Sequence, residues 1–382
     1  MKLVIHKADE KIRMVVICFA MFTGLMLFQT PYKNLGTISA GTTLFMTLAT
    51  AFLHRRGLRR QLTVNKGNVY LATFLVYSIL LTMIKGFSVS GLVKYIGQIV
   101  LCLLLFSVKM NQREQRYMNN VFLSSSTVYA ILIIWSYLEN TRAGYYHTNV
   151  ILFNTAIDPN FICIPMVASS PLLLDNILHR RRLSVSLIVY IINVTATIYT
   201  ASRGGCVALA CSNMLVLTFF LFSREISTKR KIMYMFLQGV LLISLISAFR
   251  LWFPLEWERI TSFGISDGSS RFRLWQTALE DWRESPFFGN GLGNAFYIHS
   301  KATHNTYLQV LSETGLVGFC LMIGFTGYML MKAFRYDIAM FSMLIGMLIQ
   351  LFFLNGLDNR CVWVILCWIA MLPNCKRIGD AI

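Results

Sequence analysis

The chain has 382 residues, of which 56% are hydrophobic and only 14% are charged. Soluble domains are about 45–50% apolar and about 25% charged, so this composition, with a mean hydropathy of +0.58, excludes an ordinary soluble protein. The formal net charge of +18 does not indicate a nucleic-acid partner, because basic residues in a membrane protein mainly fix its orientation.

Apolar segments long enough to cross a bilayer recur along the chain. A helix needs about 20 mainly apolar residues to cross the roughly 30 Å hydrocarbon layer. The pattern predicts about twelve spans, at residues 14–29, 35–53, 69–84, 91–108, 121–138, 160–174, 183–200, 204–222, 232–249, 316–331, 338–355 and 361–372. We therefore predict an all-α polytopic membrane protein, with nine spans in residues 1–249, an extracytoplasmic loop at 250–302 and three spans in residues 303–382.

Basic residues are concentrated in alternate loops between these spans. The most basic loops include 54–66, 109–120 and the triplet Arg180, Arg181 and Arg182. Because Lys and Arg accumulate in cytoplasmic loops, this asymmetry predicts that these loops and both termini face the cytoplasm. The 9 cysteines lie mostly in apolar runs without metal-site spacing, and we expect neither a metal site nor a cofactor.

The long loop at 250–302 contains too many aromatic residues for a disordered tether. Residues 267–270 predict a turn and helix cap, and residues 271–285 then show the apolar spacing of an amphipathic helix that Pro286 ends. Arg271 lies in the first turn, and Trp275 follows on the same face. The glycines of residues 287–294 can bring backbone close to a ligand, but the P-loop lysine is missing.

Two further polar groups lie at the predicted outer boundary of the membrane. Thr303 can cap a short helix that carries His304, and Gly315 marks a break before the next span. Arg203 lies between Ser202 and two glycines at the outer end of another span. Taken alone, the histidine is most often structural, and the arginine is equally well explained by snorkelling to lipid headgroups.

The predicted topology places Arg203, Arg271 and His304 on the same side of the membrane. Two planar guanidinium groups suit a diphosphate, because each donates paired hydrogen bonds to phosphate oxygens. A nearby histidine can accept the proton of a sugar hydroxyl. Together these residues predict a glycosyl-transfer site with a lipid-diphosphate leaving group.

In the order and spacing of these motifs the sequence resembles the O-antigen ligase and polymerase superfamily of bacterial membrane enzymes. The resemblance covers residues 183–331. It rests on four motifs: Ser202-Arg203-Gly204, Arg271 with Trp275, Pro286 to Gly293, and His304-Asn305-Thr306-Tyr307 followed by Glu313, Gly315 and Gly318. Asp158-Pro159-Asn160, before the sixth span, also resembles an outer-face feature of the family.

The resemblance implies a function for these residues. Arg203 and Arg271 would hold the diphosphate of an undecaprenyl-linked glycan, with Arg273 as a competitor for Arg271, and His304 would activate the acceptor hydroxyl. Trp275, Asn305, Tyr307, Asp158 and Asn160 are further candidate substrate-binding residues. The implied enzyme is an inverting, metal-independent glycosyltransferase of the bacterial inner membrane that acts on its extracytoplasmic side.

The acceptor decides between two enzymes of this kind. A polymerase extends the chain on a second undecaprenyl-linked repeat, whereas a ligase transfers the finished chain to lipid A-core. The modest outer loop favours the polymerase. Expected partners are the lipid-linked oligosaccharide, the acceptor glycan or glycolipid, membrane lipids and other polysaccharide-assembly proteins. A lipid-linked-glycan transporter is less favoured, because neither internal repeats nor matched broken helices are evident.

Overall fold

The structure is a computed structural model that describes residues 12–27, 44–53, 65–85, 89–142, 150–152, 155–222, 265–293, 299 and 302–373, together with separate positions between 227 and 251. Its described elements are almost entirely helical. Five helices are long and apolar enough to span a membrane, at Lys66–Lys85, Gln112–Glu139, Pro159–Leu178, Arg203–Phe222 and Thr306–Tyr336. Shorter apolar helices pack among them, as expected for a polytopic membrane protein.

The helices lie mostly in the predicted spans, whereas α12 (Ile265–Glu284) lies in the predicted loop 250–302. They are α1 (Met14–Leu27), α3 (Lys66–Lys85), α4 (Val89–Leu105), α5 (Gln112–Arg142), α6 (Pro159–Ile162), α7 (Ile164–Leu178), α8 (Leu183–Tyr199), α9 (Arg203–Phe222), α12 (Ile265–Glu284), α14 (Thr306–Tyr336), α15 (Ile338–Gln350) and α16 (Arg360–Ala370). Residues 44–53 are also helical. Much of the predicted spans 35–53 and 232–249, and parts of the loop 250–302, lie outside the described residues, so the number twelve stays a prediction.

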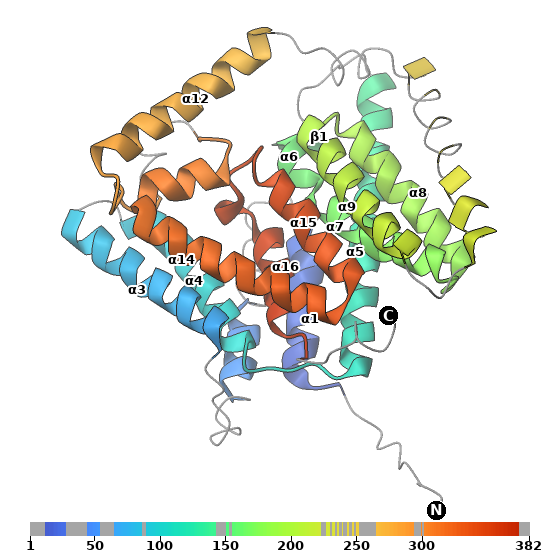
Figure 1. Ribbon diagram of the computed structural model, residues 1–382, viewed down its shortest axis with the longest axis horizontal. Helices are drawn as coiled ribbons and strands as arrows, with labels where there is room; N and C mark the ends of the chain where they lie inside the picture. The colour runs from blue at the N-terminus through green and yellow to red at the C-terminus, as the bar shows by residue number, and fades with distance from the viewer. Residues whose placement is uncertain are drawn as a thin grey trace, which may run out of the picture.

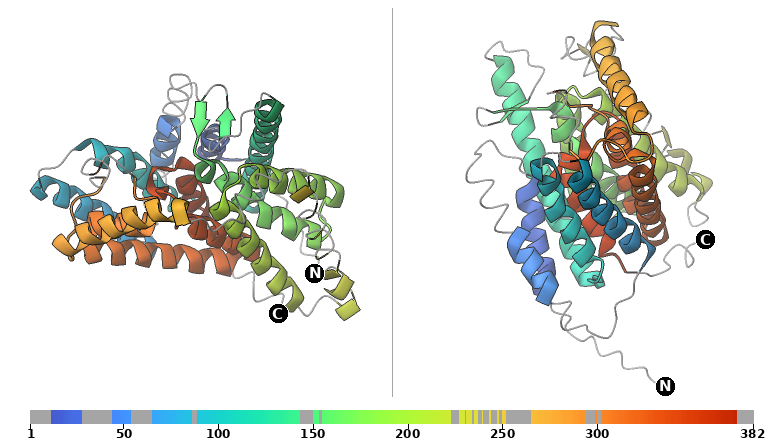
Figure 2. Two further views of the ribbon diagram at one scale, coloured as in Figure 1. Left: turned by 90° about the horizontal axis from the view of Figure 1, so that it is seen from above. Right: turned by 90° about the vertical axis from the view of Figure 1, so that its left-hand side faces the viewer.

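One feature departs from an all-helical chain. Strands β1 (Val150–Leu152) and β2 (Thr155–Ile157) form a short antiparallel hairpin in which Val150 pairs with Ile157. Figure 2 shows this hairpin as two arrows beside the helices, and β1 contacts α5. The hairpin leads directly into Asp158 and α6.

Buried polar side chains join the helices at the centre of the molecule. Ser126 of α5 and Ser169 of α7 both donate hydrogen bonds to the Asn193 side-chain oxygen of α8, at 2.8 and 3.0 Å. Ser170 of α7 and Asn213 of α9 are similarly paired. Interhelical hydrogen bonds of this kind fix the packing of membrane helices, where apolar side chains alone confer little specificity.

Helix α14 contains a sharp kink that docks the outer loop. Gly315 has φ +62°, and a chain segment that starts at Pro286 hydrogen-bonds to the opened backbone there. Leu316 and Val317 donate to the Pro286 and Phe287 carbonyls at 2.9 and 3.2 Å. The predicted break at Gly315 is therefore confirmed, although the helix continues on both sides of it.

The same contact continues on the other side of the kink. The Asn290 and Gly291 amides donate to the carbonyls of Ser312 and Glu313 at 3.1 and 2.7 Å, and the buried Glu313 carboxylate accepts the Gly293 amide at 2.8 Å. A Cβ on Gly289 would overlap the Gly315 backbone nitrogen. Gly289 thus permits close approach of two backbone segments, whereas the predicted approach of this segment to a ligand stays a prediction.

Helix α12 is held over this docked segment. Its Trp282 indole donates to the Pro286 carbonyl at 3.0 Å, and the Asn290 side chain donates to the Asp281 carbonyl at 2.9 Å. The helix begins at Ile265, so residues 267–270 lie inside it and do not form the predicted turn and cap. Figure 1 shows α12 with α6 and β1 at the end of the molecule opposite the first residues of α1.

We expect Gly315→Ala to destabilise the protein. Alanine at a positive φ costs about 1–2 kcal/mol, and its Cβ would also overlap the Phe287 backbone. Gly327→Ala, in the same helix, is the matched control, because a Cβ there meets nothing within 4 Å. Thermal unfolding of both purified variants checks this, and equal unfolding temperatures would contradict the role assigned to the kink.

Candidate active site

The four charged residues that the sequence predicts for the site lie in or beside four helices. Asp158 precedes α6, Arg203 begins α9, Arg271 lies in α12 and His304 precedes α14. Hydrogen bonds and electrostatic contacts connect these positions, although they are far apart in the sequence.

Asp158 fixes the start of the short helix α6. One of its carboxylate oxygens accepts the backbone amide and the side-chain amide of Asn160, at 2.7 and 2.9 Å. This is a helix N-cap, which occupies one oxygen atom of the carboxylate. Asp158 therefore has a structural role, and its other oxygen has no hydrogen-bond donor among the described residues.

Asn160 joins α6 to the segment that carries Arg203. Its buried side-chain oxygen accepts a 2.7 Å hydrogen bond from the Ser202 hydroxyl, which in turn accepts the Gly205 amide at 3.0 Å. Ser202 thereby caps the first turn of α9 and places Arg203 beside the Asp158 segment. Asn160 therefore links α6 to the start of α9.

Two glycines behind Arg203 bring α9 close to its neighbours. A Cβ on Gly204 would overlap the ring of Phe353, and one on Gly205 would overlap the sulfur of Cys163. These two glycines thus permit close packing of the helices, as small residues commonly do in membrane proteins.

The segment after α15 connects this part of the site to α14. Phe353 lies in that segment, and the Thr306 hydroxyl donates to the Leu354 carbonyl at 2.7 Å and accepts the Gly356 amide at 2.7 Å. The start of α14, which follows His304, is thus attached to the segment that contacts Gly204. Residues 353–356 therefore contact both the start of α9, next to Arg203, and the start of α14, next to His304.

His304 has an unusual backbone and an unpartnered side chain. Its φ of +51° lies in the left-handed region, which costs a non-glycine residue about 1–3 kcal/mol. Its Nδ1 atom is buried without a hydrogen-bond partner in the described part of the chain. A strained backbone and an unsatisfied buried nitrogen are both typical of functional sites.

The electrostatic surroundings of His304 identify its neighbours. Burial lowers the pKa of His304 below its usual value of 6.5, the Asp158 carboxylate opposes this shift, and the Arg271 guanidinium adds to it. Arg271 and Asp158 therefore lie within electrostatic reach of the imidazole. A lowered pKa keeps the imidazole neutral at physiological pH, which is the form that can accept a proton.

The two candidate arginines of α12 differ in their surroundings. Arg271 is partly buried and acts on His304, whereas Arg273 is exposed. Trp275 follows Arg271 on the same helix face, and its buried indole N–H has no partner among the described residues. The inner face of α12 therefore presents a cation and a free hydrogen-bond donor.

Asn305 and Tyr307 have structural roles. Asn305, not Thr303 as the sequence suggested, caps α14 by accepting the amides of Tyr307 and Leu308 at 3.0 and 3.1 Å. The Tyr307 hydroxyl donates to the Leu348 carbonyl at 2.8 Å, and its ring packs 4.3 Å from that of Phe352. These contacts account for both side chains within the fold, and their part in substrate binding stays a prediction.

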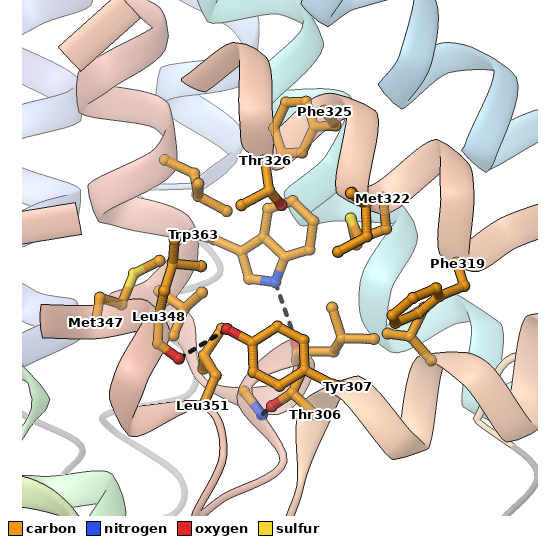
Figure 3. A pocket seen from close by; sticks show the side chains of 16 residues that line it. Thr306, Tyr307, Phe319, Met322, Phe325, Thr326, Met347, Leu348, Leu351 and Trp363 are labelled. Carbon is orange, nitrogen blue, oxygen red and sulfur yellow. Dashed lines mark hydrogen bonds between the residues drawn. The ribbon is translucent and has the colours of Figure 1, made fainter. Parts of the chain in front are cut away.

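Tyr307 also faces an apolar cavity between α14, α15 and α16. The cavity has a volume of about 50 Å³ and is lined by Phe319, Met322 and Trp363 among others. Figure 3 shows Tyr307 and Trp363 on opposite sides of it. Its apolar walls offer no group for acid–base chemistry, so it adjoins the site without contributing to it chemically.

One contributor was missed by the sequence analysis. Gln350, at the end of α15, is buried and donates a 2.7 Å hydrogen bond to the Asn160 carbonyl. It thereby joins α15 to the α6 segment. An amide within an otherwise apolar helix is the signal that identifies such a residue, because a buried amide requires hydrogen-bond partners.

One comparison with known proteins found a family match for part of the chain. Residues 188–323 match the family model described as O-antigen ligase. No curated protein matches the chain. The matched region includes Arg203, Arg271 and His304, together with the glycine segment and the kink of α14. Residues 188–323 are therefore similar to the O-antigen ligase family of membrane enzymes.

Proposed function

We propose that the protein is a polysaccharide repeat-unit polymerase that transfers an undecaprenyl-diphosphate-linked glycan to an acceptor hydroxyl. The observation that carries this proposal is the grouping of His304 with Arg271 and Asp158, on an element attached to the start of α9. A neutral imidazole near Arg271, with Arg203 on the adjoining segment, combines a base with binding groups for a diphosphate.

The arginines would bind the leaving group. Arg203 and Arg271 come from different helices, so they can approach a diphosphate from two directions. Each guanidinium offers paired donors to phosphate oxygens, and their charge stabilises the negative charge that develops as the diphosphate departs. Arg271 is favoured over Arg273 because it is partly buried and lies near His304.

His304 would act as the general base. The acceptor hydroxyl oxygen forms a bond to the anomeric carbon while the bond from that carbon to the diphosphate oxygen breaks. The hydroxyl proton passes to an imidazole nitrogen, and undecaprenyl diphosphate leaves with the bonding electron pair. Attack opposite the leaving group inverts the anomeric configuration. No step in this sequence requires a metal ion.

The proposed membrane placement follows from the positions of the charges. Asp158 and Arg203 lie at one end of α7, α8 and α9, and the basic residues between α7 and α8 lie at the other end. We infer that the site faces outward from the bacterial inner membrane and that both termini are cytoplasmic. Residues 250–302 then form the extracytoplasmic loop between the membrane regions 1–249 and 303–382.

An O-antigen ligase is the second candidate, favoured by the description of the matching family model. It would use the same donor and the same base, with lipid A-core as acceptor. We prefer the polymerase because the outer loop is modest and a second lipid-linked repeat suffices as acceptor. Membrane lipids and other polysaccharide-assembly proteins are the proposed partners.

Deletion of the gene tests the function directly. We expect long glycan chains to disappear from a gel of cell glycans while single repeats remain. His304→Ala should fail to restore them, because loss of a general base slows turnover about 10²–10⁴-fold, whereas His179→Ala, far from the site, should restore them. Loss of all repeats from lipid A-core, with long chains retained on the carrier, would instead identify a ligase.

Substitution of the arginines tests the diphosphate role. We expect Arg203→Gln and Arg271→Gln each to slow turnover about tenfold to 150-fold, because a charge-assisted contact contributes roughly 1.5–3 kcal/mol. Arg273→Gln removes the same charge from an exposed position and should change turnover less than twofold (about 0.4 kcal/mol). The measurement is polymerisation of a purified lipid-linked repeat, and equal losses at 271 and 273 would contradict the assignment.

The pH profile of the reaction tests the electrostatic grouping. Activity should rise with pH as His304 loses its proton, at a pKa below 6.5. Arg271→Gln removes a positive charge and should move this acidic limb to higher pH, whereas Asp158→Asn removes a negative charge and should move it to lower pH. Identical acidic limbs in the wild type and both variants would show that His304 is not the titrating base.

A further inference from the structure

A second, larger cavity lies between α5, α7 and α8. It has a volume of about 730 Å³ and is lined by the first half of α5, the end of α7 and the start of α8. Because α7 begins beside Asp158 and α8 ends beside Ser202, this cavity lies at the opposite end of these helices from the candidate active site. The glycosyl-transfer chemistry therefore does not account for it.

One wall of the cavity is strongly polar and basic. It carries three arginines and three asparagines, namely Arg116, Asn119, Asn120, Asn176, Arg181 and Arg182. Arg181 contacts the Asp175 carboxylate at 3.3 Å, whereas Arg116 and Arg182 have no carboxylate partner among the described residues. The cavity therefore has an uncompensated positive charge, surrounded by amide donors that suit phosphate oxygens.

The backbone of α8 adds to this preference for an anion. Arg182 occupies its N-cap with φ +46°, and no side chain caps the helix there. The first amides of α8 are thus not satisfied by a capping side chain and lie at the positive end of the helix dipole. A phosphate group bound between Arg116 and Arg182 would lie beside them.

Apolar side chains line the rest of the cavity. Val128 of α5 and Val185 of α8 are 48% and 62% exposed, respectively, on helix faces that the described residues do not cover. Both helices are apolar enough to belong to the membrane region. A ligand in this cavity therefore meets basic groups at one end and hydrocarbon at the other.

We propose that this cavity binds an anionic phospholipid of the cytoplasmic leaflet. Arg116 and Arg182 hold the phosphate of the headgroup, and an acyl chain follows the groove past Val128 and Val185. Inorganic phosphate shares the headgroup chemistry, but it would leave the apolar wall without a partner. Basic pockets between membrane helices on the cytoplasmic side suit anionic headgroups for the same reason.

The proposal is tested with the purified full-length protein and three probes: phosphatidylglycerol, phosphatidylcholine and inorganic phosphate. We expect phosphatidylglycerol to raise the unfolding temperature, because a ligand that binds only the folded state stabilises it. Phosphatidylcholine and phosphate at the same concentration should produce little change. An equal rise with inorganic phosphate would overturn the assignment to a lipid.

Substitution of the two arginines measures how much their charge contributes to lipid binding. Arg116→Gln and Arg182→Gln should each weaken phosphatidylglycerol binding about fivefold, and the double variant about 25-fold, given the usual contribution of one basic residue near an anionic headgroup. Arg335→Gln, at the exposed end of α14 outside the cavity, removes the same charge and should leave binding unchanged. Wild-type affinity in the double variant would overturn the proposal.

A second variant keeps every charge and obstructs the cavity. Ser124 lines the cavity between Asn120 and Val128 and is exposed, so the indole of Ser124→Trp should block the path between the basic and apolar parts without disturbing the core. We expect it to abolish stabilisation by phosphatidylglycerol while the protein stays monodisperse. Retained stabilisation in this variant would overturn the proposal, even if the double arginine variant proves too unstable to purify.

Discussion

The candidate site depends on one backbone contact, the docking of residues 286–293 on the kink of α14. Gly315 opens the helix there, and Gly289 allows a second backbone to approach it without a side chain between them. The resulting hydrogen bonds satisfy backbone groups that the kink releases, which is a strict requirement near a membrane. Through this contact α12, with Arg271, is held over the start of α14, next to His304.

Buried polar side chains near the docked segment fall into two groups. The buried Glu313 carboxylate accepts the Gly293 amide, so its negative charge is engaged in holding the loop. His304 Nδ1 and the Trp275 indole, in contrast, have no partner among the described residues. The scaffold groups are hydrogen-bonded to one another, and the groups available for a substrate are those that the scaffold does not use.

The two ends of α7 and α8 differ in the charged groups that lie beside them. At one end a histidine with a lowered pKa lies near an arginine and a carboxylate, whereas at the other end two of the three arginines that line a cavity have no carboxylate partner among the described residues. The first arrangement suits proton transfer beside a bound anion, and the second suits anion binding alone. Arginines therefore have different neighbours at the two ends of these helices, and the two arrangements suit different chemistry.

Hydropathy and charge in the sequence determined the membrane class and the order of most spans, because a helix that crosses lipid must be apolar along its whole length. Motif order also indicated Arg203, Arg271 and His304. Only the tertiary structure distinguished Arg271 from Arg273 by burial, assigned Asn305 and Asn160 to capping and linking roles, and identified Gln350. These assignments depend on which side chains meet across distant segments, and local sequence patterns do not encode such contacts.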